Sequence, residues 1–222
     1  MRLLVLDVEG TLFGTRVHLP GTSITSTIWQ SLAKSLGPEA VSAEVMTHEQ
    51  WAAGRYGSYL DWMRATIEIH QTFGLDESLF LRTIEAADYN PGVAEAFDRL
   101  NRCAFTPVLI TGGFRALAAR AQADLGIRHA FSACDYFFDD NGHLSGYNLL
   151  PCDFEGKLDF IHLMLREYGL RESDWVFVGD GANDVPIAAA APLSIAYRPH
   201  PELRAVASHV MEDFARLSEL LT

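Results

Sequence analysis

The chain has 222 residues, 49% of them hydrophobic and 21% charged, so it can bury a sizeable core. Its formal net charge of −12 argues against nucleic acid and anionic membrane surfaces as partners, because both would repel it. The first apolar run, residues 3–6, ends at Asp7, which is unlike a signal peptide, and no apolar stretch is long enough for a transmembrane helix. Three scattered cysteines are typical of reduced thiols in the cytoplasm.

Short apolar runs alternate with helical patterns along most of the chain. Apolar runs at residues 3–8, 107–110, 175–178 and 193–197 predict buried parallel strands. Helices are predicted over 114–125 and 157–168, since a glycine follows the last apolar position of each. Asn141-Gly142 between two apolar segments predicts a β-hairpin over about 136–150. This alternation favours an α/β fold with a Rossmann-like parallel sheet.

Residues 14–90 differ from the rest, because helical periodicity dominates and no strand-like alternation is convincing. We expect a helical insertion there, after which Pro91 is predicted to occupy the first position of the returning helix. The sequence therefore predicts two parts, a core made of residues 1–13 and 91–222 and a helical cap over 14–90 that shields the site from water.

Polar residues follow the predicted strands at their carboxyl ends, where open α/β sheets bind ligands. Three groups are expected to meet at this edge, together with Lys157, which opens a helix: Asp7, Glu9 and Thr11; Thr111, Gly112 and Gly113; and Asp180, Asn183 and Asp184. Several close carboxylates need a cation to stay ionised together, and oxygen ligands with room for water suit Mg²⁺. Mg²⁺, a lysine and backbone amides together could receive a phosphoryl group.

Two acids with one residue between them can take different roles in phosphoryl transfer. An aspartate can attack phosphorus and carry the phosphoryl group as an acyl phosphate. A second acid two positions on lies on the same side of an extended chain and can move the protons, which contributes roughly 10²–10⁴-fold in rate. Asp7 and Glu9 have this spacing.

Four segments in this order resemble the motifs of the haloacid-dehalogenase-like superfamily: "DVEGT" from Asp7, "TGGF" from Thr111, Lys157, and "GDGANDVPIAAAA" from Gly179. Their spacing is most similar to the phosphoserine-phosphatase-like branch. The resemblance is continuous from about residue 91 to the end and includes residues 1–13. In residues 14–90 it concerns position and helical character, and hardly the sequence.

The resemblance implies a Mg²⁺-dependent phosphatase that hydrolyses a small phosphomonoester through a phosphoaspartate. It implies these roles: Asp7 as nucleophile and metal ligand; Glu9 as general acid/base and, through its backbone carbonyl, metal ligand; Thr111 and Gly112 as phosphate ligands; Lys157 as the neutralising cation for nucleophile and phosphate; Asp180 as metal ligand; and Asn183 and Asp184 as supports of phosphate, metal and Lys157.

The chain departs from the family pattern at two places. Glu9 stands where most members have aspartate; it keeps the acid/base function, could favour a different leaving group, and argues against dehalogenation, since dehalogenases lack an acid there. Shortly after the first motif, Arg16 and His18 stand where the phosphoserine branch places an amine-binding glutamate, which puts phosphoserine itself in doubt. Arg55, Tyr56 and Arg64 are further candidates for substrate specificity.

Two other functions stay open at this stage. A phosphotransferase would pass the phosphoryl group to a small-molecule hydroxyl in place of water, and the sequence does not separate this from hydrolysis. A non-catalytic binding protein of the same fold is disfavoured by the complete set of polar residues. Neither the substrate nor the oligomeric state follows from the sequence.

Overall fold

The computed structural model describes residues 1–221 and divides the chain into two compact units. We call the first the core unit; it comprises Met1–Gly14, Tyr89–Ala133 and the chain from Cys152 on. The second, called the helical unit, comprises Thr15–Asp88 and Cys134–Pro151. Residues 134–151, which the sequence pattern assigned to the core, thus group with the helical insertion. Within the described residues, no helix has both the length and the apolar character needed to cross a membrane.

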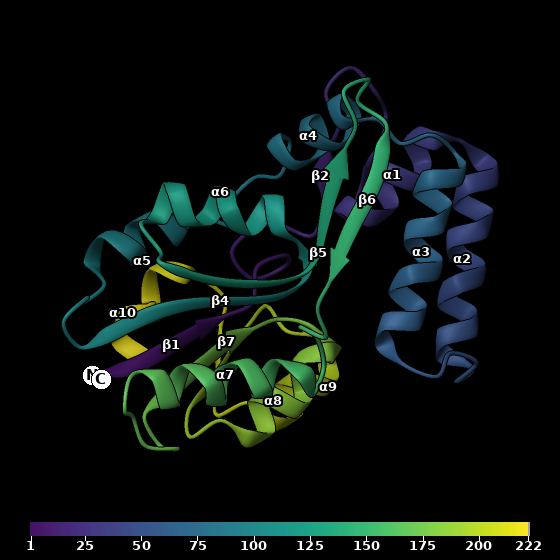
Figure 1. Ribbon diagram of the computed structural model, residues 1–222. Helices are drawn as coiled ribbons and strands as arrows, with labels where there is room; N and C mark the ends of the chain where they lie inside the picture. Colours follow the sequence, from purple (N-terminus) through teal and green to yellow (C-terminus); the bar gives the residue numbers. More distant parts are fainter. Residues whose placement is uncertain (222) are drawn as a thin grey trace. The chain divides into compact units, whose positions relative to one another are not determined.

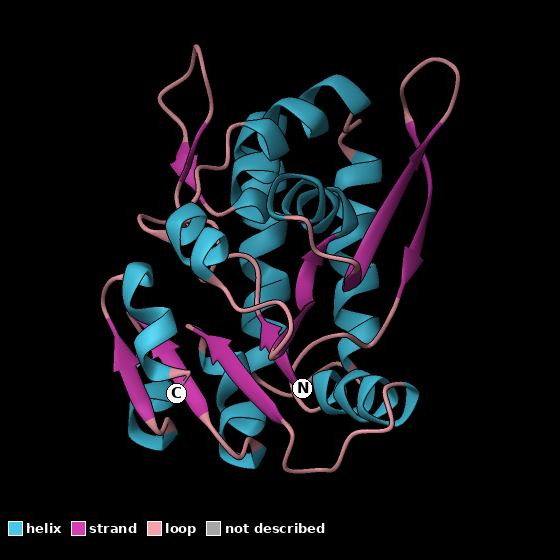
Figure 2. Ribbon diagram, turned by 90° about the vertical axis from the view of Figure 1, so that its left-hand side faces the viewer, coloured by secondary structure: helices cyan, strands magenta, loops and turns pink. Residues whose placement is uncertain are grey.

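The core unit is built on a mostly parallel sheet, which confirms the expected α/β class (Figure 1). The strand order of the sheet is β6-β5-β4-β1-β7-β8-β9, in which β6 and the second half of β5 belong to the helical unit. Strand β1 pairs in parallel with both β4 and β7. The strands are β1 (Arg2–Leu6), β4 (Phe105–Phe114), β5 (His129–Phe138), β6 (Leu144–Leu149), β7 (Trp175–Gly179), β8 (Ser194–Tyr197) and β9 (His209–Met211). The apolar side chains of β1 are fully buried because helices cover both faces of the sheet (Figure 2).

Helices α5 and α6 lie on one face of the core sheet, and α7 and α8 lie on the other (Figure 1). The helices of this unit are α5 (Val93–Arg99), α6 (Arg115–Leu125), α7 (Gly156–Glu167), α8 (Val185–Ala190), α9 (Pro201–Val206) and α10 (Leu217–Leu220), with single turns η1 (Ala182–Asp184) and η2 (Phe214–Arg216). Helix α6 ends at Gly126 in the left-handed conformation, φ 62°, as its sequence predicted.

The structure corrects several element boundaries. Strand β4 continues through the whole Thr111–Gly113 segment, which was expected to follow the strand. Pro91 does not open a helix: α5 begins at Val93, because Gly92 turns the chain at φ 85° where a Cβ would lie 2.7 Å from the backbone nitrogen of Ala215. Strand β9 was not predicted, since its three residues are too short to show a period.

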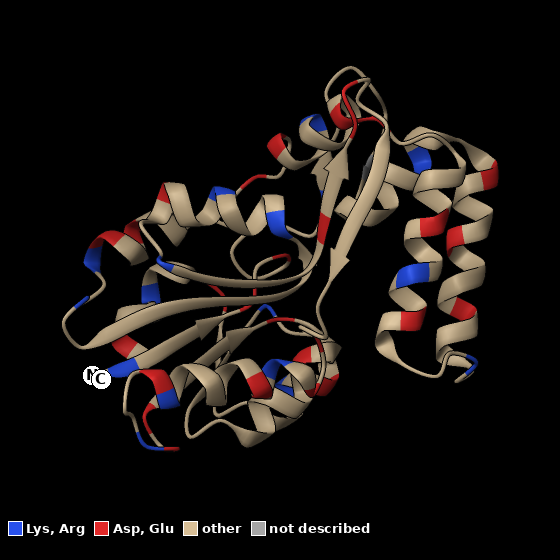
Figure 3. Ribbon diagram, viewed as in Figure 1, with Lys and Arg blue, Asp and Glu red and all other residues tan. Residues whose placement is uncertain are grey.

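The helical unit contains α1 (Ile28–Leu36), α2 (Pro38–Ala52), α3 (Tyr59–Thr72) and α4 (Glu77–Glu85), with the short antiparallel pair β2 (Val17–His18) and β3 (Thr25–Ser26). Thr27, Ser58 and Asp76 cap α1, α3 and α4 by accepting a hydrogen bond from a backbone N–H of the first turn. Acidic and basic residues alternate along α3, which is typical of a solvated helix face (Figure 3).

The predicted hairpin forms, with Asn141-Gly142 between β5 and β6, and its far half packs within the helical unit. The hydroxyl of Tyr136 lies 2.7 Å from Nδ1 of buried His70, and burial lowers the pKa of His70 to about 4. His70 is therefore neutral at pH 7 and joins α3 to the hairpin by a neutral hydrogen bond.

A second buried titratable group of the helical unit is Glu44 on α2. The residue is 4% exposed, and its Oε1 has no hydrogen-bond partner among the residues that the structure describes. Burial raises the pKa of Glu44 to about 7, although Lys34 opposes the shift. The folded state therefore binds a proton that the unfolded chain releases at lower pH, so stability is lost as pH rises towards 7.

Replacing this carboxyl tests that assignment. Glu44→Gln keeps the shape but never ionises, so we expect the variant to unfold like the original protein at pH 5 and to be more stable at pH 8, by about 1–2 kcal/mol. Thermal or denaturant unfolding at both pH values measures the difference. Glu49→Gln, an exposed site on the same helix, is the matched control. A difference that does not change with pH would contradict the assignment.

Candidate functional site

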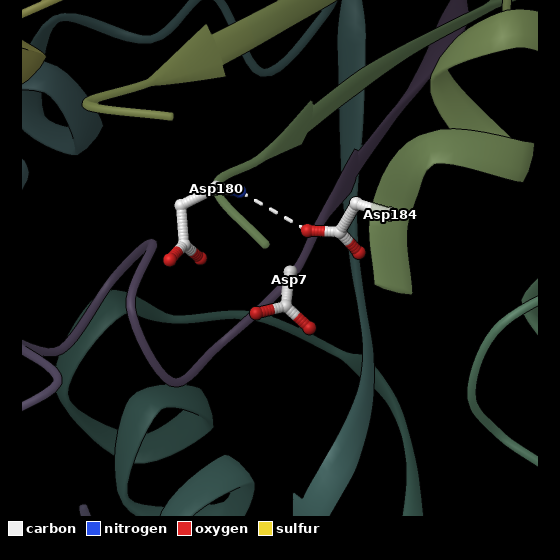
Figure 4. A group of neighbouring side chains, drawn as sticks. All are labelled: Asp7, Asp180 and Asp184. Atoms are coloured by element: carbon white, nitrogen blue, oxygen red, sulfur yellow. Dashed lines mark hydrogen bonds between the residues drawn. The ribbon is translucent and has the colours of Figure 1, made fainter. Parts of the chain in front are cut away.

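Three carboxylates of the core unit lie together at the carboxyl ends of neighbouring strands. Asp7 follows β1, Asp180 follows β7, and Asp184 ends the turn η1. One ligand oxygen of each lies within 4.8 Å of the others, and the side chains point toward one another (Figure 4). The backbone N–H of Asp180 donates to Oδ2 of Asp184 over 3.0 Å, which fixes the loop between them.

The ammonium group of Lys157 lies beside these acids. It donates to Oδ1 of Asp7 over 2.7 Å and to Oδ1 of Asp184 over 2.6 Å, and its side chain is completely buried. Lys157 stands in the first turn of α7, so the helix begins at the site. A lysine is almost never fully buried unless it is paired, and here the pairing acids come from sequence positions 150 and 27 residues away.

The acids outnumber the cation, and their electrostatics fit a divalent metal. Burial raises the pKa of Asp180 to about 7, and the charge of Asp184 adds to the shift. Burial also raises the pKa of Asp7, against the opposing effect of Lys157. Burial alone would lower the pKa of Lys157, but Asp184 and Asp7 raise it, so the ammonium stays charged. A bound divalent cation would let the acids ionise together, and carboxylate oxygens are its preferred ligands.

Glycines make room for the polar side chains of the site. A Cβ at Gly10 would lie 2.2 Å from Oδ2 of Asp180, and a Cβ at Gly179 would lie 2.4 Å from Oδ2 of Asp184. Gly10 also has φ +94°, a conformation that other residues rarely adopt. Gly10 of "DVEGT" is therefore needed both for the turn and for the close approach of Asp180, and Gly179 of "GDGAND" is needed for the close approach of Asp184.

The loop after β1 is held by its own polar residues. The hydroxyl of Thr11, which is fully buried, donates to Oδ1 of Asp180 over 2.8 Å. Glu9 is half-buried, and its Oε2 lies 3.9 Å from the position that a Cβ on Gly113 would occupy. The structure therefore brings Glu9 next to the Thr111–Gly113 segment of β4. The hydroxyl of Thr111 accepts a hydrogen bond from the N–H of Gly113 over 3.1 Å, so this amide already has a partner.

Two residues that the sequence pattern did not single out belong to the same neighbourhood. Nδ2 of Asn90 donates to the carbonyl oxygens of Gly10, Thr11 and Phe13 over 3.0, 2.9 and 3.2 Å. Asn90 returns from the inserted segment, and "YNPG" signals a turn but not this contact.

The other overlooked residue is Asp153. Its Oδ1 accepts a hydrogen bond from Nδ2 of Asn183 over 2.7 Å and lies 3.7 Å from Nζ of Lys157. The spacing of four residues between Asp153 and Lys157 is a sequence signal for an ion pair near a helix start. It is weak alone, because such pairs are common on solvated surfaces.

The five residues considered for substrate specificity all belong to the helical unit: Arg16, His18, Arg55, Tyr56 and Arg64. Arg16, His18, Arg55 and Arg64 are exposed. The hydroxyl of Tyr56 donates to Oε1 of Gln50 over 3.0 Å, and Arg64 pairs with Asp61 one turn earlier on α3. Their contacts within this unit do not test a role in specificity, which remains a prediction.

Residues 1–192 match the family model for haloacid dehalogenase-like hydrolases, and the geometry of the site agrees with this match. The chain belongs to the haloacid dehalogenase-like hydrolases. This confirms the resemblance carried by the four motifs, and it makes the chain a member of a hydrolase family.

Similar proteins point to one branch of this family. The chain is 27% identical to the "Probable phosphoserine phosphatase" of Schizosaccharomyces pombe over 93% of its own length and 64% of that protein. It is 28% identical to the "Phosphoserine phosphatase" of Streptococcus thermophilus, over 99% of this chain and 95% of that one. The solved "Phospho-Aspartyl Intermediate Analogue of Phosphoserine phosphatase" shares the fold, with a TM-score of 0.76, 20% identity and coverage of 99% and 97%. The chain thus spans less than two thirds of the S. pombe relative.

Asn90→Ala tests whether this side chain holds the loop that carries Glu9 and Thr11. The substitution leaves three backbone carbonyls without their side-chain donor, so we expect unfolding to become easier by about 1–3 kcal/mol. Denaturant unfolding measures the loss. Asn148→Ala, at an exposed position, is the control. Equal stability of the two variants would show that the loop holds without Asn90.

Proposed function

We propose that the protein is a Mg²⁺-dependent phosphatase that hydrolyses a small phosphomonoester through a phosphoaspartate on Asp7. The observation that carries this proposal is the buried acid cluster with Lys157 bonded to Asp7, in a chain of the haloacid dehalogenase-like family. The relatives named as phosphoserine phosphatases, one of them solved as an analogue of a phospho-aspartyl intermediate, support the same reaction class.

In the first step, the carboxylate of Asp7 attacks phosphorus, and the bond between phosphorus and the ester oxygen breaks. Glu9 gives its proton to the leaving oxygen, so the alcohol departs neutral. Lys157 holds Oδ1 of Asp7, which leaves Oδ2 as the attacking oxygen. Burial of Asp7 keeps this carboxylate weakly solvated, so little water must be removed before it attacks.

In the second step, Glu9 accepts a proton from water as the water oxygen bonds to phosphorus. The acyl phosphate bond breaks, which returns the carboxylate of Asp7 and releases inorganic phosphate. Glu9 ends the cycle protonated, as it began. In this proposal Thr111, Gly112 and Asn183 bind the phosphoryl oxygens, and the ammonium of Lys157 neutralises part of their charge.

The acids best suited to hold the Mg²⁺ are Asp7, Asp180 and Asp184, together with the backbone carbonyl of Glu9. A bound Mg²⁺ would neutralise negative charge on the phosphoryl group. Both oxygens of Asp184 already accept hydrogen bonds, one from Lys157 and the other from the N–H groups of Asp180 and Gly181. Asp184 therefore also orients the lysine and the loop that carries Asp180.

We propose that the helical unit selects the substrate, with Arg16, His18, Arg55, Tyr56 and Arg64 as candidate contacts. Cationic and neutral side chains near residue 16 suit an anionic or neutral group better than an ammonium group. The substrate is thus proposed to be a small phosphomonoester that need not be phosphoserine.

Phosphate release from a panel of phosphomonoesters with Mg²⁺ tests the proposed activity. The panel contains phosphoserine, homoserine phosphate, sugar phosphates and a nitrophenyl ester. We expect turnover of at least one, and its loss both in Asp7→Asn, which removes the nucleophile, and after treatment with EDTA. Turnover that survives in Asp7→Asn would overturn the phosphoaspartate. A folded protein that binds Mg²⁺ and turns over no ester, with or without an added alcohol, would favour a binding role.

Glu9→Gln and Glu9→Asp separate proton transfer from substrate choice. The amide cannot move a proton, so we expect Glu9→Gln to lower kcat roughly 10²–10⁴-fold. Glu9→Asp keeps the acid but withdraws it by one methylene, so we expect the ranking of substrates with different leaving groups to change. An unchanged ranking would remove the link between Glu9 and the leaving group.

Adding an alcohol acceptor to the same reactions distinguishes hydrolysis from phosphotransfer. For a phosphatase we expect inorganic phosphate to equal the alcohol released from the substrate. A phosphorylated acceptor that forms at the expense of inorganic phosphate would show that a hydroxyl replaces water in the second step.

A further inference from the structure

We propose that Asp153 is a positioning residue that orients the side-chain amide of Asn183 toward the phosphoryl site, a proposal that rests on the proposed function. Asp153 lies outside the four family motifs, in the turn before α7. Its side chain is 12% exposed, and the 2.7 Å hydrogen bond from Asn183 joins it to the "GDGAND" segment.

An ionised carboxylate can only accept hydrogen bonds, so it decides which end of an amide faces it. Asn183 must present its NH₂ group to Asp153, and its Oδ1 then lies on the opposite side, 2.1 Å from where a Cβ on Gly181 would be. The amide is thus held between Asp153 and the bare Cα of Gly181. One N–H of Asn183 is used by Asp153, and the second is left to donate elsewhere, as a phosphoryl oxygen requires.

The turn that carries Asp153 holds this carboxylate in place. Phe154 has a positive φ of 48°, a conformation that is costly for a bulky residue and is found mostly where the surroundings impose it. The N–H of Gly156 donates to the carbonyl of Asp153 over 3.0 Å. A Cβ at Gly112 would lie 2.2 Å from Oδ2 of Asp153, so the carboxylate lies directly over the phosphate-binding segment of β4.

The distances favour action through Asn183 over action through Lys157. The contact between Asp153 and Nζ of Lys157 is 3.7 Å, beyond hydrogen-bond range, and Lys157 is already held by Asp7 and Asp184 at 2.7 Å or less. The contact with Asn183 is short and has a charged acceptor, which makes it one of the stronger kinds of hydrogen bond. Asp153 therefore chiefly orients Asn183, and it faces Lys157 in an ion pair that has no hydrogen bond.

A double-mutant cycle tests this assignment. Asp153→Ala, Asn183→Ala and the double variant are compared with the original protein in kcat, KM and the dissociation constant for inorganic phosphate with Mg²⁺. We expect Asp153→Ala to weaken phosphate binding and kcat/KM about 10–100-fold, the range for a hydrogen bond to a charged group. The double variant should lose no more than Asn183→Ala alone, because Asp153 acts through that side chain.

Two further variants separate positioning from general damage. Asp153→Asn keeps an oxygen acceptor at the same place, so we expect it to recover most of the phosphate affinity that Asp153→Ala loses. Glu155→Ala removes an exposed acid from the same turn and should leave phosphate binding unchanged. Losses that multiply in the double variant, or an Asp153→Asn variant as weak as Asp153→Ala, would overturn the assignment and favour an effect of charge on Lys157.

The side-chain amide signal of Asn183 in an NMR spectrum gives a readout that does not need turnover. The signal is assigned by its absence in Asn183→Ala, and we expect it to shift in Asp153→Ala but not in Glu155→Ala. If the protein hydrolyses no phosphomonoester, the proposed function fails while this measurement still decides whether Asp153 orients Asn183. An unshifted amide in Asp153→Ala would overturn the contact in either case.

Discussion

The ammonium of Lys157, fully buried among acids, is the interaction on which the rest of the site depends. Removing a lysine from water is expensive, and the cost is offset only because Asp7 and Asp184 accept two short hydrogen bonds from it. The dependence is mutual, since without Lys157 each acid would be a buried negative charge that lacks this cation. Three separate segments of the chain, after β1, at the start of α7 and after β7, must therefore come together for any of them to be stable.

This mutual dependence explains why the motifs contain so many glycines. Four glycines each lie against one polar side chain of the site, and a Cβ at any of them would overlap that side chain. The pairs are Gly10 with Asp180, Gly179 with Asp184, Gly112 with Asp153, and Gly181 with Asn183. A phosphoryl site needs many polar groups in a small volume. Glycine leaves room where those groups come together, so the glycines of the motifs mark the positions at which polar side chains pack against the backbone.

Much of the core unit could be predicted from the sequence because its strands are continuous apolar runs that end in polar residues. The placement of Asp7, Asp180 and Lys157 at one edge followed from the geometry of parallel sheets and from the motifs. Asp153 and Asn90 could not be found in this way, because their side-chain hydrogen bonds join sequence-distant residues and leave no periodic pattern. The hairpin was predicted from Asn141-Gly142, but its membership of the helical unit depends on tertiary contacts such as the one between His70 and Tyr136.

The two segments that form the helical unit each leave the core and return to it beside their point of departure. Phe13 and Tyr89, at the ends of the long insertion, share a β-bridge and stack their rings with centroids 4.1 Å apart. The hairpin closes likewise, since Cys134 pairs with Leu149. When the two ends of an inserted segment lie side by side, the entropy cost of closing the loop rises only slowly with the length of the insertion. The fold can therefore exchange or resize these segments in evolution while the strands of the core, and the acids at their ends, keep their register.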